Sequence, residues 1–238
     1  MSMIFSVEGN IGSGKSTLIK HLKEQMKEMC GFKIVYLEEP VDIWQTIKDS
    51  QGNDIIKRYY EDQKKFAFQF QMMAYITRIT QLRKAIQQHE NCIIITERSI
   101  LTDKNVFAKM LHDNGTLGEI SHQIYLKWFE ELSMNLEINS SIYIKTNPET
   151  SLKRVLKRNR PGETITIDYL KTCHENHEKW LQNDNLVLLL NGETEYTNEI
   201  PWAWLLAIKT HLNNMVEPLA NLDKVYNLLH EQHWTVGC

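Results

Sequence analysis

Gly9-Asn10-Ile11-Gly12-Ser13-Gly14-Lys15-Ser16 is the stretch that decides the fold of this chain. It matches the pattern G-x-x-x-x-G-K-[ST] and lies between an apolar run, residues 3–7, and a helix-forming segment, Thr17 to Lys27. A strand before this pattern and a helix after it form the context of a phosphate-binding loop, or P-loop. The sequence therefore predicts that a nucleoside triphosphate binds between the first strand and the first helix.

The residues of this loop have separate predicted roles. Glycines allow successive backbone N–H groups to turn toward phosphate oxygens, which the positive end of the following helix also attracts. Lys15 is expected to reach the β- and γ-phosphates, and the Ser16 hydroxyl to hold the Mg²⁺ that bridges them. The residues expected to bind the triphosphate are Gly9, Asn10, Ile11, Gly12, Ser13, Gly14, Lys15, Ser16 and Thr17. A glycine-rich turn that binds nothing is the alternative, but the fixed positions and both flanks match the binding pattern.

Composition and charge narrow the classes of partner. The chain has 238 residues, 42% of them hydrophobic, and a net charge of −3, which argues against a nucleic-acid binder with a broad basic face. Its four cysteines, Cys30, Cys92, Cys173 and Cys238, have no C-x-x-C spacing, which indicates reduced thiols. No targeting segment and no apolar run long enough to span a membrane is visible. We expect a soluble, cytoplasmic protein with a small substrate and no nucleic-acid or membrane partner.

Short apolar runs alternate with long amphipathic segments along the chain. The runs are rich in Ile, Val and Leu, as expected for strands buried on both faces of a parallel sheet. They cover five segments, residues 3–7, 33–37, 92–96, 141–144 and 186–190. Together with the helices between them, they predict a doubly wound α/β fold whose active residues follow the carboxyl ends of the strands. No linker or repeat divides the chain, so we expect a single domain over residues 1–238.

Acidic residues follow two of these strands. Glu39, held extended by Pro40, is expected at the edge of the sheet where the phosphate loop opens, and there it can accept a hydroxyl proton. A solvated strand end is the alternative for Glu39. Glu97 ends the third strand in the manner of a Walker B carboxylate that supports Mg²⁺. Arg98, beside it, places a cation where phosphate charge develops.

A long helix is predicted from Asp62 to His89. Gln71 and Arg78 lie two turns apart on one of its faces, with the small Ala74 between them. An amide and a guanidinium aligned in this way can bind a planar polar group such as a nucleobase edge. A solvent-exposed polar stripe is the alternative that spacing alone favours. Asp103 is expected to pair with Arg78 if the next helix packs against the long one.

A basic run ends the helix that begins at Pro148. It contains Lys153, Arg154, Lys157, Arg158 and Arg160, and Pro161-Gly162 follows it. Arg154 and Arg158 lie one turn apart, which suits them to grip phosphates, and the Pro-Gly step allows the segment to move as a lid over about residues 154–163. A solvated helix end, stabilised by the helix dipole, is the alternative.

These motifs, in this order, resemble those of the deoxynucleoside kinase family, in particular its deoxycytidine/deoxyguanosine kinase group. The resemblance covers about residues 3 to 190. Its motifs are Glu8-Gly9-Asn10-Ile11, Glu39-Pro40-Val41 with Trp44, Phe70-Gln71 with Arg78, Glu97-Arg98-Ser99 with Asp103 and Phe107, and the arginines Arg154, Arg158 and Arg160. It implies a P-loop kinase that transfers the γ-phosphate of ATP, with Mg²⁺, to the 5′-hydroxyl of a deoxynucleoside in nucleotide salvage.

The resemblance also implies a role for each matching residue. Glu39 is the general base on the 5′-hydroxyl, Arg98 contacts that hydroxyl and the transferring phosphate, and Glu97 and Ser16 hold Mg²⁺. Tyr60 and Glu163 bind the sugar 3′-hydroxyl. Gln71 binds the base edge, Phe107 stacks on the base, and Trp44 and Phe70 form the walls of the pocket. Lys15, Arg154, Arg158 and Arg160 bind the ATP phosphates.

Base preference depends, in this family, on the Arg78–Asp103 pair. Members that take cytosine or purines keep the pair, whereas thymidine-preferring relatives have small or apolar residues there. The resemblance therefore implies deoxycytidine and/or purine deoxynucleosides as substrates, with a thymidine-preferring or broad-specificity enzyme as the alternative. The chain departs from the family pattern at Asp42-Ile43, in Asn191 to Pro201, and in an expected C-terminal extension, residues 214–238.

A homodimer is a further implication, since family members dimerise through helices. The predicted helix from His122 to Met134 carries an apolar stripe, Tyr125, Trp128, Phe129 and Leu132, which is expected to serve core or subunit packing.

Two other functions remain as alternatives, a nucleoside monophosphate kinase and a non-catalytic P-loop nucleotide-binding protein. The first requires arginines for an acceptor phosphate, whereas Glu39 and Glu163 suit a hydroxyl acceptor. The second is disfavoured because a base and a lid are both present.

Overall fold

A six-stranded sheet forms the centre of the protein. The computed structural model describes residues 2–194, 196 and 199–233, with side chains as far as residue 222. The strand order is β2-β3-β4-β1-β5-β6, and all neighbouring strands are parallel except the antiparallel pair β2 and β3. The strands are β1 (Met3–Glu8), β2 (Glu28–Met29), β3 (Phe32–Leu37), β4 (Cys92–Glu97), β5 (Ser140–Lys145) and β6 (Val187–Asn191).

The five parallel strands confirm the sequence prediction, with ends that differ by one residue in most cases. The predicted strand number of five is wrong by one, because β2 adds a sixth strand at the edge. Its two residues return into β3 through a turn in which Cys30 and Gly31 both have positive φ, 51° and 85°. Two residues are too few to give a periodic pattern, so the sequence carried no usable signal for β2.

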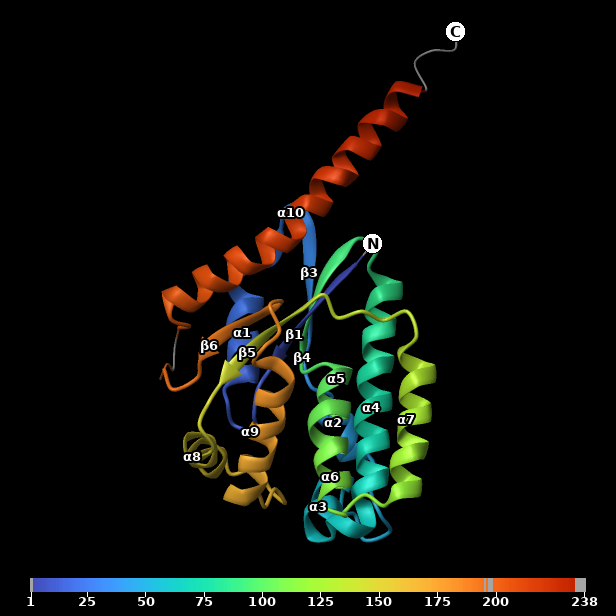
Figure 1. The fold of residues 1–238 in the computed structure, drawn as a ribbon, viewed down its shortest axis with the longest axis vertical. Coiled ribbons are helices and arrows are strands. Elements are labelled where there is room, and N and C mark those ends of the chain that lie inside the picture. Colours follow the sequence, from blue (N-terminus) through green and yellow to red (C-terminus); the bar gives the residue numbers. More distant parts are fainter. Residues whose placement is uncertain (1, 195, 197–198, 234–238) are drawn as a thin grey trace.

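Helices connect the strands and cover both faces of the sheet (Figure 1). They are α1 (Lys15–Gln25), α2 (Val41–Thr46), α3 (Ile55–Glu61), α4 (Gln63–Gln88), α5 (Ile100–Thr102), the π-helical turn η1 (Asp103–Ala108), α6 (Lys109–Asp113), α7 (Glu119–Ser133), α8 (Pro148–Arg158), α9 (Ile167–Leu181) and α10 (Trp202–His233). The first helix starts two residues earlier than predicted, at Lys15. The long helix α4 starts after Asp62, whose carboxylate accepts a hydrogen bond from the Lys65 N–H and so caps the helix.

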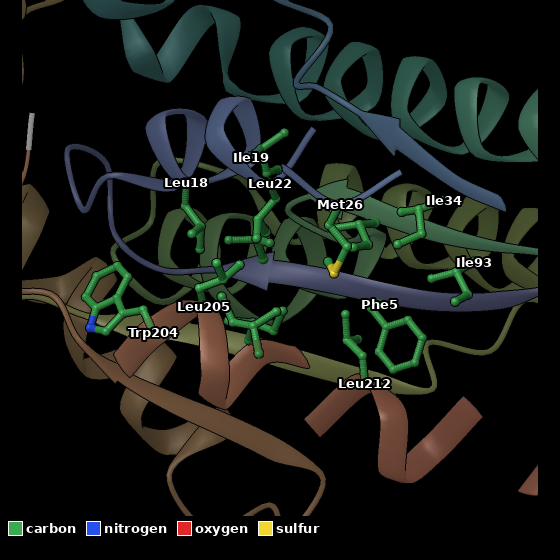
Figure 2. Close-up of a cluster of buried hydrophobic side chains, with 14 of the residues drawn as sticks. Phe5, Leu18, Ile19, Leu22, Met26, Ile34, Ile93, Trp204, Leu205 and Leu212 are labelled. Atoms are coloured by element: carbon green, nitrogen blue, oxygen red, sulfur yellow. The ribbon is translucent and has the colours of Figure 1, made fainter. Parts of the chain in front are cut away.

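Two apolar layers hold the helices to the sheet. On one face, α1 and α10 pack against β1 and its neighbours. Figure 2 shows Leu212 of α10 beside Phe5, and Leu18 and Leu22 of α1 farther along the same layer. On the other face, α4 contributes Leu82 and Ala85, which pack against Ile4, Cys92 and Ile94. Strands covered on both faces explain the near-continuous apolar runs in the sequence. The doubly wound α/β class is confirmed.

The last helix, α10, runs through the position where the C-terminal extension was expected to begin. Val216 and Ala220 lie after residue 214, yet both belong to the buried side chains, and Val216 is part of the core around α1. Figure 1 shows the end of α10 directed away from the rest of the molecule. Residues 234–238 of the expected extension lie outside the described residues. In the part of the chain that is described, no helix combines the length and apolar character needed to cross a membrane.

Candidate active site

One cavity of about 700 Å³ opens along the carboxyl ends of β1, β3 and β4. It extends from the phosphate loop to an aromatic pocket between α2, α4 and η1, with the basic end of α8 beside it. Of the residues predicted for the site, those that line it are Ile11, Gly12, Ser13, Gly14, Lys15, Ser16, Thr17, Glu39, Trp44, Tyr60, Phe70, Gln71, Arg78, Glu97, Arg98, Asp103, Phe107, Arg154, Arg158, Arg160 and Glu163. A triphosphate and a second, planar substrate can therefore share one cavity.

The phosphate loop depends on backbone conformations that glycine permits. Gly12 has a φ of 80°, and a Cβ atom there would lie 2.5 Å from the backbone oxygen of Ser151 in α8. Gly14, with a φ of 101°, directly precedes α1, and it lines the cavity together with the first two residues of that helix, Lys15 and Ser16. The loop and α8 consequently approach each other more closely than any residue with a side chain would allow at position 12.

Gly9 and Asn10 are the two predicted phosphate ligands that do not line the cavity. The amide nitrogen of Asn10 donates to the backbone oxygen of Leu170 in α9, at 2.8 Å, and its side-chain oxygen accepts from the Ile11 N–H at 2.9 Å. The backbone oxygen of Gly9 accepts a hydrogen bond from Arg98, at 2.9 Å. In this arrangement both residues fix the loop to its surroundings, Asn10 to α9 and Gly9 to the segment after β4.

Lys15 lies at the centre of the loop and is buried. Its Nζ donates to the backbone oxygen of Asn10, at 2.7 Å. Burial and, secondly, the positive charge of Arg98 lower the pKa of Lys15 to about 7, against the opposing effect of Glu97 and Glu39. The negative charge of a bound polyphosphate would stabilise the protonated form of Lys15. The site is therefore suited to an anion.

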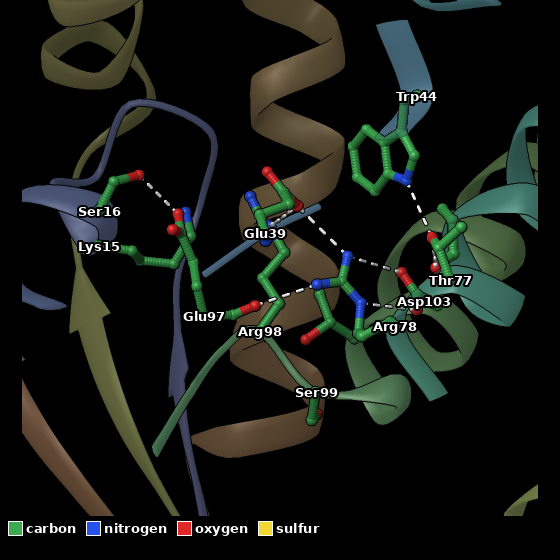
Figure 3. A network of polar contacts seen from close by, with 12 residues as sticks. Lys15, Ser16, Glu39, Trp44, Thr77, Arg78, Glu97, Arg98, Ser99 and Asp103 are labelled. Carbon is green, nitrogen blue, oxygen red and sulfur yellow. Dashed lines mark hydrogen bonds and ion pairs between the residues drawn. The ribbon is translucent and has the colours of Figure 1, made fainter. Parts of the chain in front are cut away.

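Ser16 and Glu97 form a pair of oxygen donors beside Lys15. The Ser16 hydroxyl donates to Oε1 of Glu97, at 2.6 Å (Figure 3). Mg²⁺ prefers oxygen ligands and is commonly held by one or two protein groups together with water and substrate phosphates. A hydroxyl and a carboxylate at the end of the phosphate loop fit this pattern. Among the described residues, no group of three or more His, Cys, Asp and Glu side chains is placed to hold a metal ion.

Glu39 follows β3 and contacts two arginines with the same oxygen. Its Oε1 lies 3.2 Å from Nη2 of Arg78 and 3.3 Å from Nε of Arg98. Figure 3 shows the other carboxylate oxygen directed away from both guanidinium groups. Burial alone would raise the pKa of Glu39, but Arg98, Arg78 and Lys15 lower it below its ordinary value. The carboxylate is therefore ionised and held in one orientation, with an oxygen left to accept a proton.

Arg78 makes the predicted pair with Asp103. Its Nε donates to Oδ2 of Asp103 at 3.0 Å, and its Nη1 donates to the backbone oxygen of Glu97 at 3.0 Å. Arg78 is only 6% exposed and Gln71 only 2%, so the interpretation of this helix face as a solvated stripe is wrong. The paired carboxylates raise the pKa of Arg78 against the effect of its burial, and burial raises the pKa of Asp103. The predicted contact is confirmed, and it requires η1 to pack against α4.

Arg98 has an unusual backbone conformation, with a φ of 62°. Strain of this kind is uncommon outside glycine and persists only where surrounding contacts impose it. Here the Arg98 N–H donates to the Val7 oxygen at 3.0 Å, and the guanidinium lies 5.0 Å from the centre of the Phe107 ring. The guanidinium is thus fixed between the phosphate loop, Glu39 and the aromatic pocket.

The aromatic pocket is closed by rings and by one amide. The indole N–H of Trp44 donates to the Thr77 hydroxyl at 2.9 Å, and its ring meets Phe70 edge to face at 5.6 Å. The side-chain oxygen of Gln71 is buried and has no hydrogen-bond partner within the described part of the chain. A flat ligand between these rings would provide the missing donor. This combination fits a nucleobase better than a purely apolar ligand.

The predicted lid comprises the last turn of α8 and the turn that follows it. Arg154 donates to the Ser13 oxygen of the phosphate loop, at 3.4 Å. Glu163 joins Arg158 at 2.5 Å and Arg160 at 3.9 Å, although its own side chain is almost buried. Gly162, with a φ of 79°, lies against the Lys57 side chain of α3. The arginines therefore stand beside the phosphate loop, while Glu163 connects them to the pocket that also contains Tyr60.

Sequence reasoning missed several residues that line the cavity. They are Ile56, Lys153, Lys157, Tyr169, Thr194 and Tyr196. The two lysines belong to the predicted basic run but were given no role there, whereas Tyr169 and Tyr196 belong to no motif. Tyr169 reaches the cavity because α9 packs on η1, and the Tyr196 hydroxyl lies 3.7 Å from the position that a Cβ atom on Gly14 would occupy. Only the tertiary fold contains this information.

Fold and site together define a P-loop phosphotransferase: a parallel sheet with a phosphate loop, a half-buried carboxylate beside two arginines, and a basic helix end next to the loop. The model of the deoxynucleoside kinase family matches residues 5–221. A probable deoxycytidine kinase of fowlpox virus (strain NVSL) is 37% identical over 204 residues, which cover 82% of this chain and 80% of the relative. Human deoxycytidine kinase is 30% identical over 217 residues, 82% of this chain and 80% of that protein. The mitochondrial deoxyguanosine kinase of Xenopus laevis is 28% identical over 242 residues, 89% of this chain and 87% of its own length.

The chain therefore belongs to the deoxynucleoside kinase family, and it is an ATP-dependent deoxynucleoside kinase. The resemblance seen in the sequence is confirmed.

Proposed function

We propose that this kinase prefers deoxycytidine and/or purine deoxynucleosides and that it serves nucleotide salvage, the supply of DNA precursors from free deoxynucleosides. The observation that supports the preference is the buried Arg78–Asp103 pair beside Gln71 and Ala74 in the aromatic pocket. A base with a polar edge can bind such groups, whereas the 5-methyl group of thymine would desolvate them without a compensating bond. The names of the relatives, deoxycytidine and deoxyguanosine kinases, favour the same preference.

The reaction follows from the order of groups along the cavity. The 5′-hydroxyl approaches Glu39, which accepts its proton while the hydroxyl oxygen attacks the γ-phosphorus of ATP. The bond from the γ-phosphorus to the bridging oxygen breaks at the same time, and ADP leaves. Arg98 stabilises the charge on the transferring group, and Lys15, Arg154, Arg158 and Arg160 bind the phosphates. Ser16 and Glu97 would hold Mg²⁺, which would supply positive charge for the phosphate oxygens of ATP.

A lowered pKa does not disqualify Glu39 as the base. Phosphoryl transfer proceeds through a loose transition state, in which little negative or positive charge develops on the attacking oxygen before the proton leaves. The carboxylate then orients the hydroxyl and accepts its proton late in the transfer. The contacts of its Oε1 with Arg78 and Arg98 support that role, because they fix the carboxylate and direct its second oxygen elsewhere.

The sugar and the base of the nucleoside are expected to bind at opposite ends of the pocket. We assign the sugar 3′-hydroxyl to Tyr60 and Glu163, which both line the cavity near the lid. The base lies between Phe107 on one side and Trp44 with Phe70 on the other, and Gln71 binds its edge. The buried, unpartnered oxygen of Gln71 supports this assignment.

The proposed preference is tested by the rates at which the four deoxynucleosides are phosphorylated with ATP and Mg²⁺. We expect deoxycytidine, deoxyadenosine or deoxyguanosine to have the highest kcat/KM and thymidine the lowest. Thymidine as the best substrate would refute the proposed preference while leaving the family assignment intact. Deoxynucleoside monophosphates, measured in the same way, serve as a control for acceptor type, and we expect no transfer to them.

We also propose that the enzyme is a homodimer formed through α7 and the adjacent face of α4. The residues of the apolar stripe predicted for this helix lie on two different faces of α7. Tyr125 and Phe129 are buried against α4, whereas Trp128 is 49% exposed. Ile120, Ile124 and Trp128 follow each other at intervals of four residues on the exposed face of α7. Figure 1 shows α4 and α7 side by side, and Ile76 of α4 is also exposed. A second copy would cover this apolar surface.

Sedimentation equilibrium tests the dimer. We expect the wild-type protein to sediment as a dimer and Trp128→Glu to sediment as a monomer, because an added charge opposes burial of this face. Leu206→Glu, which changes an exposed leucine of α10, is the matched control and should remain a dimer. A monomeric wild-type protein would contradict the proposal.

A cytoplasmic location completes the proposed function. Cys30, Cys92 and Cys173 are free thiols in the structure, which favours a reducing compartment. Fractionation of cells that express the tagged chain, with detection in the cytosolic or the mitochondrial fraction, tests this location.

A further inference from the structure

Glu8 is a buried carboxylate at the end of β1 that the proposed reaction does not use. It has no solvent exposure and directly precedes Gly9, the first residue of the phosphate loop. Its Oε1 accepts a hydrogen bond of 2.9 Å from the backbone N–H of Ser99, and its Oε2 accepts one from the Thr102 hydroxyl. A carboxylate in this position would be very unfavourable without such donors, so the two contacts fix residues 99–102 to the end of β1.

These contacts replace a local helix cap. Ser99 occupies the position before α5, where a serine side chain commonly caps the helix, but its hydroxyl has no hydrogen-bond partner in the described structure. The carboxylate of Glu8, from a different strand, instead accepts a hydrogen bond from the backbone N–H of Ser99 itself. The start of α5 is therefore held in place by Glu8, next to the phosphate loop, and not by a side chain of the helix itself.

The fixed segment lies between two residues of the site. Arg98 precedes Ser99, and Asp103 follows Thr102 directly. Figure 3 shows Arg98 and Ser99 on the same strand end, with Arg78 reaching from α4 to Asp103. Arg98 keeps a strained backbone with a φ of 62°, and Asp103 is buried, so neither residue can hold its position without support from its neighbours.

We propose that Glu8 is a positioning residue for phosphoryl transfer. Through Ser99 and Thr102 it aligns Arg98 and Asp103 with the phosphate loop, and through Asp103 it aligns Arg78 and Glu39. The inference rests on the proposed roles of Arg98 and Glu39 in the transfer step. Small displacements of such groups reduce the rate strongly, because the reacting atoms must be held close to their attack geometry.

Thr102→Val tests the proposal more cleanly than Glu8→Ala, which leaves two buried donors unpaired and is expected to fold poorly. Valine keeps the shape of threonine and removes only the hydroxyl that Glu8 binds. We expect kcat to fall about tenfold, while KM for ATP changes less than about twofold, because the displaced groups act in the transition state. Thr102→Ser restores the hydroxyl and should recover kcat to within about twofold of the wild-type value.

Thr96→Val is the matched control. Thr96 is also a buried threonine close to the end of β4, but its hydroxyl has no hydrogen-bond partner among the described residues, so the same substitution breaks no contact. We expect its kcat to equal that of the wild type. Thermal unfolding of each variant, measured beside kcat, separates a loss of folded protein from a loss of alignment.

Crystal structures of the wild type and of Thr102→Val give a readout that does not depend on turnover. The proposal expects the Arg78–Asp103 and Arg98–Gly9 contacts to lengthen in the variant. Unchanged contacts overturn it whatever happens to kcat, and so does an unchanged kcat. If the wild-type protein phosphorylates no deoxynucleoside, the proposed function fails, and the two structures still decide whether Glu8 positions these residues.

Discussion

The two halves of the cavity are built by different means. The phosphate loop is one continuous stretch, and its geometry depends on the backbone conformations of Gly12 and Gly14. The nucleoside pocket contains side chains from α2, α4, the end of β4 and η1, and a buried network of charges holds it together. The comparison teaches that a site made from backbone can be recognised in the sequence as a motif. A site made from side chains requires the fold to bring its parts together.

The largest effect is expected where the two halves meet, at Glu39. Glu39→Gln keeps the shape of the side chain but removes the proton acceptor. Since a general base contributes roughly 10²- to 10⁴-fold, we expect kcat to fall about 10³-fold while ATP binding changes little. Turnover and ATP titration on the same protein measure the two properties. Glu38→Gln, which changes the neighbouring exposed acid that pairs with Lys23, is the control and should leave kcat unchanged.

The nucleoside half is expected to depend on its buried charges for stability. Asp103→Ala leaves the Arg78 guanidinium buried with only Glu39 as an ionic partner. Because breaking a buried pair commonly costs about 3–5 kcal/mol, we expect the free energy of unfolding in urea to fall by about 3 kcal/mol. Arg78→Met combined with Asp103→Ala should recover part of this loss, since no unpaired charge remains.

An exposed pair provides the comparison for that prediction. Lys109 and Asp113 form an ion pair at 2.7 Å, and each side chain is 52% exposed. Asp113→Ala should lower the free energy of unfolding by less than about 1 kcal/mol, because water screens exposed pairs. Equal losses from Asp103→Ala and Asp113→Ala would contradict the view that burial makes the Arg78 network essential.

ATP binding in the phosphate half of the cavity is expected to depend on the backbone conformation of the loop. In Gly12→Ala, the new Cβ would lie 2.5 Å from the Ser151 oxygen at a φ of 80°. The loop must shift to relieve this contact, and strain of about 2 kcal/mol corresponds to roughly 30-fold weaker ATP binding. Deoxynucleoside affinity should change little, because the new Cβ meets Ser151 and Val155 of α8 and none of the residues assigned to the nucleoside.

Gly31→Ala is the control that separates two effects of an added Cβ atom, contact with neighbouring atoms and strain in the backbone. Gly31 has a similar φ of 85°, but no atom lies within 4 Å of the position its Cβ would occupy. Calorimetric titration of ATP into both variants should show normal binding for Gly31→Ala. An affinity loss of the same size in both would mean that general destabilisation, rather than the loop geometry, is responsible.

The smallest predicted effect is a pH dependence of ATP binding. The pKa of Lys15, lowered to about 7 mainly by burial, means that this group loses its charge as pH rises through 7 in the free enzyme. The protonated form binds the triphosphate, so affinity is highest below the pKa and should fall about tenfold between about pH 6 and 8. Lys15→Met, titrated over the same range, should lack this decrease. A decrease that persists in Lys15→Met would assign it to another group.

Much of the fold could be predicted because the strands are buried on both faces. Their apolar runs, such as residues 92–96, stand out from the amphipathic helices on either side. The short edge strand β2 could not be predicted, since two residues have no periodicity. The mixed character of α7 was also hidden, because Trp128 and Phe129 are adjacent in the sequence but face solvent and core respectively.

Part of the candidate site could also be predicted from the sequence, namely the residues that belong to local patterns. Local patterns indicated Lys15, Ser16 and Glu97, whose positions follow from one strand and one loop. Spacing alone favoured a solvated stripe for Gln71 and Arg78, and the buried contact with Asp103 corrects that interpretation. The orientation of Asn10 toward α9, and the contact of Glu8 with Ser99 and Thr102, were not visible in any pattern.

The sequence by itself determined that this chain has a phosphate loop on a parallel sheet, because that information lies in the order and spacing of neighbouring residues. The tertiary structure decided how Glu39, Arg78, Arg98 and Asp103 form one buried network. Glu39 and Arg78 are far in the chain from each other and from Arg98 and Asp103. The charges of all four are compatible with burial only when they lie within hydrogen-bonding distance of a partner. Packing of η1 against α4 creates that proximity, and no local pattern in the sequence specifies it.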